Sequence, residues 1–362
     1  MKEVFLESHN VKNLYFGFGQ FNYHLIKGLY AAKAKDLKII LHAKDTGALK
    51  TEFGDYFKYK KYFSFRRYNQ FAIRKKYDLW HSLNQNIVIE PYYDIPYILT
   101  VHDVNFVHEV SSDMNHIRNI RFKEKLARSN AIVYISNFAK EATHNYFDVP
   151  NVPEYVIYNG NTIGKVDIPE NYKPNNVVLK NPFLFTIGEI NERKNFHTLV
   201  EMLQFLPKIN LIISGKNSTE YAETIQKLIA KYKLENRVYV TGKISEKDKY
   251  YYLQNCLAFV FPSLREGFGI PPIEAMSFGK PVFLAHKTSL PEIGGDYAFY
   301  WEHFDPKYMA DVFTKGMDIF ENNREDYELN YKKRASNFSW NTAASEYLEV
   351  YRQVLNNTTT VK

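Results

Sequence analysis

The segment that decides the fold lies between Cys256 and Val282 and reads CLAFVFPSLREGFGIPPIEAMSFGKPV. Its apolar beginning, residues 256–262, predicts a buried parallel strand that ends at a proline. Two glycines, Gly267 and Gly269, allow a sharp turn, and the proline pair that follows suits the first turn of a helix. A strand, a glycine loop and a helix N-terminus in this order aim backbone N–H groups at one point, which is typical of a phosphate site.

Two carboxylates, Glu266 and Glu274, flank this loop, and we expect Glu274 inside the first turn of the helix. A carboxylate can accept hydrogen bonds from two neighbouring hydroxyls of a sugar. The pair would therefore suit a nucleotide-sugar, with the ribose at one end and the transferred sugar at the other. Taken singly, each has another interpretation: Glu274 as a helix-start glutamate that complements the dipole, and Glu266 as a solvated loop charge.

The string from Glu266 to Glu274 resembles the E-x7-E segment of the retaining glycosyltransferases of family 4, the group 1 enzymes, in their mannosyltransferase-like branch. The resemblance implies an α/β fold of the GT-B type. Such a fold has two Rossmann-like domains with parallel sheets that face each other across a cleft, and a C-terminal helix that crosses back to the N-domain. The resemblance also assigns five residues to donor binding: Glu266, Gly267, Phe268, Gly269 and Glu274.

The rest of the chain agrees with two doubly wound domains, because strand-like runs alternate with helical stretches in both halves. Residues 159–176 are rich in Asn, Gly and Pro and predict a linker. We expect an N-terminal domain on the acceptor side over residues 1–165 and a donor-binding domain over 166–338. A C-terminal helix within 339–362 would pack back on the N-domain through Ala343, Tyr347, Leu348, Tyr351 and Leu355.

Two cations, Arg193 and Lys194, follow a predicted strand that ends at Gly188, at the expected start of the next helix. A cation is unfavourable there unless an anion occupies the site, and the diphosphate of a sugar donor is such an anion. For the pair alone, the alternative is two surface charges of a loop. The segment from Gly188 to Asn195 resembles the family's G-x4-R-K-N element, whose Arg and Lys bind the donor phosphates.

A histidine, His102, ends another apolar run and is followed by Asp103. Such a histidine can be a satisfied structural residue. The two residues resemble the family's T-[IV]-H-D segment, in which the His contacts the donor sugar near the reacting centre. The resemblance thus places His102 with Arg193, Lys194 and Glu266 as catalytic residues, while Asp103 would contact the acceptor or support the backbone.

Weaker landmarks lie elsewhere in the N-terminal half. Gly17 and Gly19 precede a helix expected over Phe21–Lys33, and in the family this glycine loop closes over the diphosphate and sugar. The chain departs from the family here, because Gln20-Phe21 stands where relatives often have Arg-Tyr. Ser136 is placed near the acceptor by the same resemblance.

The resemblance implies transfer of a sugar with retention of anomeric configuration. The donor would be GDP-mannose or a UDP-sugar, and the acceptor a glycan or a lipid-linked molecule in surface polysaccharide synthesis. No Asp-x-Asp motif occurs, so we expect no metal and no cofactor beyond the nucleotide-sugar. Two other readings stay open: a nucleotide-sugar epimerase or hydrolase of this fold, and a non-catalytic nucleotide-sugar-binding protein. A dehydrogenase is disfavoured because no Gly-x-Gly-x-x-Gly opens a strand–helix unit.

The composition favours a globular protein with an anionic partner. The formal charge is +7, the chain has 29 Tyr and 27 Phe, and its densest basic stretch, residues 58–77, interleaves aromatics with Lys and Arg. That stretch predicts either contact with an anionic membrane surface or a solvated helix face. No nucleic-acid-binding signature accompanies the charge. The start of the chain lacks a signal-peptide core, so we expect a cytoplasmic protein. Association with the inner face of the membrane is one of the two alternatives for the stretch 58–77.

Overall fold

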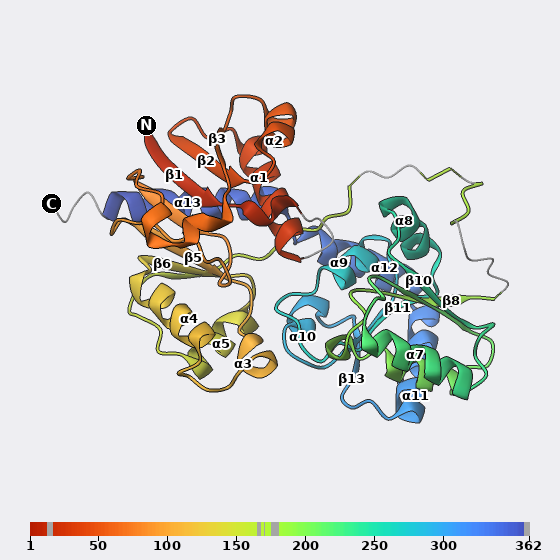
Figure 1. The fold of residues 1–362 in the computed structure, drawn as a ribbon. Helices are drawn as coiled ribbons and strands as arrows, with labels where there is room; N and C mark the ends of the chain where they lie inside the picture. Colours follow the sequence, from red (N-terminus) through yellow and green to blue (C-terminus); the bar gives the residue numbers. More distant parts are fainter. Residues whose placement is uncertain (13–16, 165–167, 170, 175–180, 358–362) are drawn as a thin grey trace. The chain divides into compact units, whose positions relative to one another are not determined.

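The computed structural model describes residues 1–12, 17–164, 168–169, 171–174 and 181–357 (Figure 1). The chain divides into two compact units. The N-terminal unit comprises Met1–Gly160 and Ser339–Lys362, and the C-terminal unit comprises Asn161–Phe338. The domain boundary predicted after residue 165 falls among residues 165–167, which lie outside the described residues.

The N-terminal unit is built on a parallel sheet with the strand order β3-β2-β1-β4-β5-β6-β7. All neighbouring strands pair in parallel. The strands are β1 (Lys2–Glu7), β2 (Leu37–Ala43), β3 (Lys58–Lys61), β4 (Leu79–Ser82), β5 (Tyr97–Val101), β6 (Ala131–Tyr134) and β7 (Glu154–Val156). The helices are α1 (Gly17–Ala32), α2 (Thr46–Phe53), α3 (Phe106–Glu109), α4 (Ile117–Arg128), α5 (Asn137–Tyr146) and α13 (Trp340–Asn357).

The C-terminal unit is built on a second parallel sheet, with the order β10-β9-β8-β11-β12-β13. Its strands are β8 (Phe183–Ile187), β9 (Asn210–Ser214), β10 (Val238–Gly242), β11 (Ala258–Phe261), β12 (Val282–Ala285) and β13 (Phe299–Trp301). Its helices are α6 (His197–Met202), α7 (Glu220–Lys231), α8 (Glu246–Asn255), α9 (Ile270–Ser277), α10 (Leu290–Gly294), α11 (Pro306–Asn322) and α12 (Arg324–Ser336). Two parallel sheets with helices between their strands confirm the predicted α/β class.

The last helix, α13, belongs to the N-terminal unit, as predicted, although the whole C-terminal unit precedes it in the chain. It packs against α1, and Gly28 makes this close approach feasible. A Cβ atom on Gly28 would lie 2.6 Å from the carbonyl oxygen of Trp340 and 2.8 Å from the Cβ of Ala344. The predicted apolar face is confirmed, because each of its residues is buried: Ala343, Tyr347, Leu348, Tyr351 and Leu355.

Helix α1 begins earlier than the sequence indicates. It starts at Gly17, so Gly17 and Gly19 lie in its first turn and not in a loop before it. The apolar contacts of the helix explain the difference, because Phe18 already packs edge-on against His102, one turn before Phe21 does the same. This packing offsets the cost of about 1 kcal/mol that each glycine brings to a helix.

Three short strands, β3, β7 and β13, were not predicted from the sequence. The strand β3 opens the basic stretch 58–77, so the prediction of a solvated helix face there is wrong. The stretch continues as two short 3-10 helices, Ser64–Arg67 and Asn69–Phe71. Lysines on an edge strand such as β3 disfavour pairing with another chain.

Among the helices of the described residues, none combines the length and the apolar character needed to cross a bilayer.

A buried histidine, His81, joins the sheet to α13. Its Nδ1 lies 2.8 Å from the Tyr351 hydroxyl, and its Nε2 lies 2.8 Å from the hydroxyl of Thr100. Burial lowers the pKa of His81 to about 3, and repulsion from His102, when that residue is protonated, acts in the same direction. Burial also lowers the pKa of His102 to about 4. Both imidazoles are therefore neutral in the folded protein near neutral pH.

We expect the free energy of unfolding to fall as the pH drops from about 6.5 toward about 4. In this window the unfolded chain protonates both histidines and the folded protein does not, so each contributes up to about 1.4 kcal/mol per pH unit. Urea denaturation at a series of pH values measures the slope. His81→Gln, which keeps a hydrogen-bonding side chain without the titration, should have a shallower slope. An identical slope in the variant would contradict the assignment.

Candidate active site

The first part of the site is a tight turn after β8 that carries Arg193 and Lys194. It is a 3-10 helix over Glu192–Lys194, and the side chain of Asn191 accepts a hydrogen bond from the Lys194 N–H group. The sequence places the two cations at the start of the next helix, but α6 begins only at His197. Asn195 explains the difference, because its left-handed backbone, with φ at +59°, interrupts the helical path and asparagine tolerates that conformation.

Glu266 joins this turn to the loop after β11. Its Oε1 accepts from the Lys194 Nζ at 2.6 Å and lies 3.3 Å from the Arg193 Nη1. The hydroxyl of Ser263 donates to the same oxygen at 2.5 Å. The side chains of Lys194 and Glu266 are only 10% and 12% exposed. The alternative of a solvated loop glutamate is therefore wrong, and so is that of two surface charges, because Lys194 is buried and the Arg193 side chain is only 28% exposed.

The charges of this cluster depend on one another. Burial alone would raise the pKa of Glu266, but Lys194 and Arg193 outweigh burial and hold it below the usual value. Burial lowers the pKa of Lys194, and the carboxylate of Glu266 opposes that shift. Two cations against one carboxylate leave a positive balance at the carboxyl end of β8. Such a site favours an anion that can replace the lost hydration of the cations.

The glycine loop has the geometry that the sequence predicts. Gly269 has φ at +121°, a conformation that side chains rarely adopt, and α9 begins directly after it with prolines in its first turn. The hydroxyl of Ser289 holds the loop, because it donates to the carbonyl oxygens of Glu266 at 2.9 Å and of Phe268 at 2.6 Å. A strand, a glycine loop and a helix N-terminus are thus confirmed at residues 258–277.

Glu274 lies deeper in α9 than expected. It is the fifth residue of the helix and is buried, so its predicted place in the first turn is wrong, as is its interpretation as a helix-start charge. Its Oε1 accepts from the Lys249 Nζ at 2.8 Å and, over a very short distance, from the hydroxyl of Thr162. Both partners supply hydrogen-bond donors to this buried carboxylate.

Lys249 is the site residue that sequence analysis missed. It lies on α8, and its side chain is 9% exposed between Glu274 and Glu246. A signal was present, because Lys249 shares a helical spacing with Tyr252 and Leu253, which are both buried. A lysine on the apolar face of a helix needs a buried carboxylate as partner. Burial opposes its charged form, yet Glu274 and Glu246 outweigh burial and raise the pKa of Lys249.

The ends of β8 and β9 meet so closely beside this site that one position admits only glycine. A Cβ atom on Gly215 would lie 1.8 Å from the Gly188 carbonyl oxygen, and φ at Gly215 is +133°. We expect Gly215→Ala to lower the free energy of unfolding by more than about 4 kcal/mol, because strain and a backbone clash act together. Urea denaturation measures the loss. Gly164→Ala is the matched control, since a Cβ there meets no atom of the described residues within 4 Å; equal losses in both variants would refute the prediction.

Comparisons with known proteins match both parts of this chain. A model described as "Glycosyl transferases group 1" matches residues 167–338, and one described as "Glycosyltransferase Family 4" matches residues 28–162. The first match includes the turn with Arg193 and Lys194, the glycine loop and Glu274. The chain belongs to the group 1 glycosyltransferases.

Other proteins and solved structures that this chain matches are consistent with this family. It is 28% identical to the serotype-specific mannosyltransferase WbdA of Escherichia coli over 257 residues, 65% of this chain and 30% of WbdA. It is 26% identical to the O-antigen chain mannosyltransferase RfbU of Salmonella typhimurium, over 64% of this chain and 67% of RfbU. The chain thus spans less than a third of WbdA. Sucrose-phosphate synthase from Thermosynechococcus elongatus superposes with a TM-score of 0.74 at 17% identity, over 99% of this chain and 100% of that one. The predicted GT-B fold is confirmed.

The remaining predicted site residues of this glycosyltransferase lie in its N-terminal unit. His102 is buried, with its Nε2 2.9 Å from the Leu83 carbonyl oxygen. Asp103 accepts from the N–H group of Asn105 at 3.0 Å, a contact that supports the backbone. The hydroxyl of Ser136 accepts from the Ala139 N–H group and caps α5. The catalytic and acceptor roles of these residues stay predictions.

The structure thus brings together Arg193, Lys194 and the segment 266–269. Glu274 lies further along α9 and forms an ion pair with Lys249 of α8. Within the described ranges, no three His, Cys, Asp or Glu side chains are grouped so that they could hold a metal ion.

Proposed function

We propose that this glycosyltransferase moves a hexose, most readily mannose, from a nucleotide-sugar to a glycan or lipid-linked acceptor in the synthesis of a surface polysaccharide. The observation that carries the proposal is the partly buried cluster in which Arg193 and Lys194 meet Glu266 beside the glycine loop. The family membership supports transfer, and the mannosyltransferases among the relatives support mannose and therefore GDP-mannose as the donor. A UDP-sugar is the second candidate.

The proposed chemistry assigns a role to each part of the C-terminal unit. The glycine loop and the N-terminus of α9 hold the diphosphate, and Glu274 accepts from the ribose hydroxyls. Glu266 accepts from hydroxyls of the transferred sugar through the oxygen that its cations do not engage. When the bond between the sugar C1 and the phosphate oxygen breaks, both electrons go to the leaving diphosphate, and Arg193 and Lys194 stabilise that charge.

We propose that the reaction retains the anomeric configuration and needs no metal. The acceptor oxygen bonds to C1 on the face that the diphosphate leaves, and its proton passes to the leaving phosphate oxygen. Two cations beside the phosphates supply the positive charge that a metal would bring, and the sequence has no Asp-x-Asp motif. Turnover that EDTA leaves unchanged, and a product whose anomeric signals match those of the donor, are the expected results.

A thermal-shift series with GDP, UDP, ADP and their common sugars tests the donor first. A nucleotide that binds only the folded chain stabilises it by about 2.7 kcal/mol at a hundredfold excess over its Kd. We expect GDP and GDP-mannose to raise the midpoint in the presence of EDTA. Release of GDP from GDP-mannose should then require an added acceptor. If free mannose appears at the full rate without an acceptor, the protein is a hydrolase; if no nucleotide shifts the midpoint, the proposal fails.

A further inference from the structure

Exposed aromatic side chains gather on one part of the N-terminal unit. Seven of the exposed large apolar residues fall between residues 63 and 93 of the chain. Direct contacts link several of them: the rings of Phe63 and Phe65 stack at 5.3 Å, and Phe65 meets Phe71 edge-on at 5.3 Å. We call these six aromatic residues, together with Val88, the aromatic rim: Phe63, Phe65, Tyr68, Phe71, Val88, Tyr92 and Tyr93.

Cations alternate with these rings. The guanidinium of Arg66 lies 5.5 Å from the centre of the Phe63 ring, and that of Arg74 lies 5.2 Å from the centre of the Tyr92 ring. Aromatic rings that are exposed to water cost free energy, and a group of them marks an interaction surface. The cations that lie over these rings need an environment that also accepts charge. An interface that is apolar on one side and anionic on the other satisfies both kinds of group.

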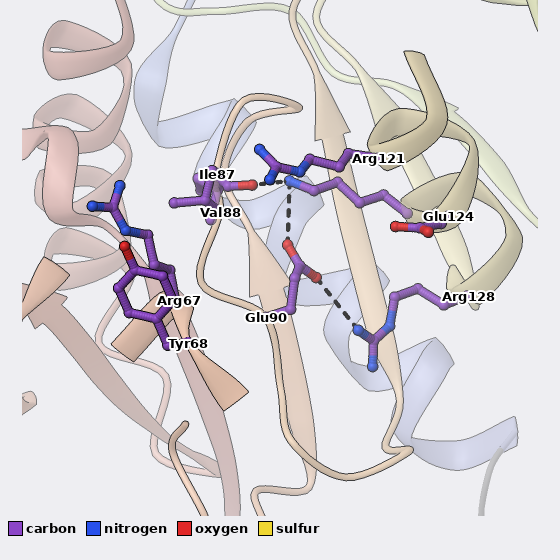
Figure 2. A pocket seen from close by; sticks show the side chains of 9 residues that line it. Arg67, Tyr68, Ile87, Val88, Glu90, Arg121, Glu124 and Arg128 are labelled. Carbon is purple, nitrogen blue, oxygen red and sulfur yellow. Dashed lines mark hydrogen bonds and ion pairs between the residues drawn. The ribbon is translucent and has the colours of Figure 1, made fainter. Parts of the chain in front are cut away.

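The rim borders a cavity of about 490 Å³, which lies within the size range of ligand sites. Figure 2 shows Arg67 and Tyr68 on one wall, and Arg121, Glu124 and Arg128 from α4 on the other. Ile87, Val88 and Glu90 lie between these walls. Two members of the rim, Tyr68 and Val88, therefore also line the cavity.

The residues that line the cavity include more cations than carboxylates. Four cations, Arg67, Arg121, Lys125 and Arg128, face two carboxylates. Glu90 binds two of those cations, because its oxygens lie 3.2 Å from the Lys125 Nζ and 3.6 Å from the Arg128 Nη1. Lys125 also donates to the carbonyl oxygens of Gln85 and Ile87, so its donors are used internally. Arg67 and Arg121 are exposed, and Glu124 is the second carboxylate among the residues that line the cavity.

We propose that this surface docks the protein on an anionic bilayer, with a lipid phosphate between Arg67 and Arg121 and the aromatic rim at the level of the headgroups. A dissolved phosphate would need the cations but not the rim. A bilayer needs both, because rings bury in the interface while cations meet the phosphates. The surface belongs to the N-terminal unit, whereas the proposed donor residues belong to the C-terminal unit. The docking proposal therefore goes beyond the proposed transfer and can be tested apart from it.

The test is sedimentation of the full chain with vesicles. One set contains phosphatidylcholine only, and the other contains equal parts of phosphatidylcholine and phosphatidylglycerol. We expect binding to the anionic vesicles. Arg67→Gln with Arg121→Gln should weaken it about fivefold for each lost charge. Phe65→Ser with Phe71→Ser should weaken it on the order of tenfold or more. All four residues are exposed, so the variants should fold.

Matched variants in the C-terminal unit separate docking from general attraction by a chain of charge +7. Lys315→Gln with Lys333→Gln removes two exposed charges there, and Leu329→Ser removes an apolar side chain that is 66% exposed. Vesicle binding in these controls should equal that of the unchanged chain. Equal loss in test and control variants would overturn the proposal, as would a failure of the unchanged chain to bind the anionic vesicles.

Competition with glycerol phosphate distinguishes a bilayer from a dissolved anion. Two results together would show a small-molecule site and overturn membrane docking. Glycerol phosphate would release the protein from the vesicles at a concentration too low to screen charge, and Phe65→Ser with Phe71→Ser would leave vesicle binding unchanged. The nucleotide thermal shift should be the same in every variant. Its absence in the unchanged chain would count against the proposed transfer and not against docking.

Discussion

Replacing Lys194 with methionine should lower turnover by about a hundredfold to a thousandfold while the nucleotide still binds. The loss is comparable to removing one preorganised group that stabilises transition-state charge. Lys194 is the cation closest to Glu266, at 2.6 Å, and in the proposed reaction it faces the departing diphosphate. Turnover of GDP-mannose and the Kd of GDP, measured on the same preparation, check the two parts of this expectation.

The same substitution should also destabilise the protein, because it leaves the Glu266 carboxylate, which is only 12% exposed, with one cation fewer. Breaking a buried ion pair costs about 3–5 kcal/mol. The double variant Lys194→Met with Glu266→Gln removes both charges and should recover most of the lost stability without recovering turnover. Recovery of turnover together with stability would mean that Lys194 only supports the fold. Unchanged turnover in the single variant would contradict its catalytic role directly.

Replacing Glu274 with glutamine should weaken nucleotide binding by about tenfold to a hundredfold and leave turnover at saturating donor largely unchanged. A charge-assisted hydrogen bond contributes about 1.5–3 kcal/mol, and a neutral amide accepts more weakly. Lys249→Met should weaken nucleotide binding in the same direction, because the buried Glu274 carboxylate loses the cation that lies 2.8 Å away. Isothermal titration with GDP measures both effects.

Glu246 provides the matched control for this pair. It also contacts Lys249, at 2.9 Å, but its side chain is 66% exposed. Glu246→Gln should therefore change neither GDP affinity nor turnover measurably. A comparable loss of affinity in all three variants would point to a general disturbance of α8. A turnover defect in Glu274→Gln as large as that in Lys194→Met would contradict the division of roles.

Local chemistry determines the elements that were predicted from sequence. Buried apolar runs bounded by glycine and proline located β8 to β12, and the order strand, glycine loop, proline-led helix located the loop at 266–269. These signals are local, since each depends on the conformations that neighbouring residues allow. The same holds for the apolar face of α13, where helical spacing alone picks out the buried residues.

Other features depend on contacts between distant residues. Lys194 and Glu266 lie 72 positions apart, and Lys249 and Glu274 lie 25 apart, so no local pattern pairs them. The early start of α1 depends on His102, and the need for glycine at Gly215 depends on the backbone of Gly188. The stretch 58–77 has the composition of a helix face or of a docking surface, and the pairing of β3 with β2 is what excludes the helix. Sequence by itself thus determined the longer strands, the glycine loop with its helix and the apolar face of α13, because those follow from local conformational preference. Only the tertiary structure decided which buried charges are partners and which aromatic rings stay exposed, because both depend on what the fold places beside each side chain.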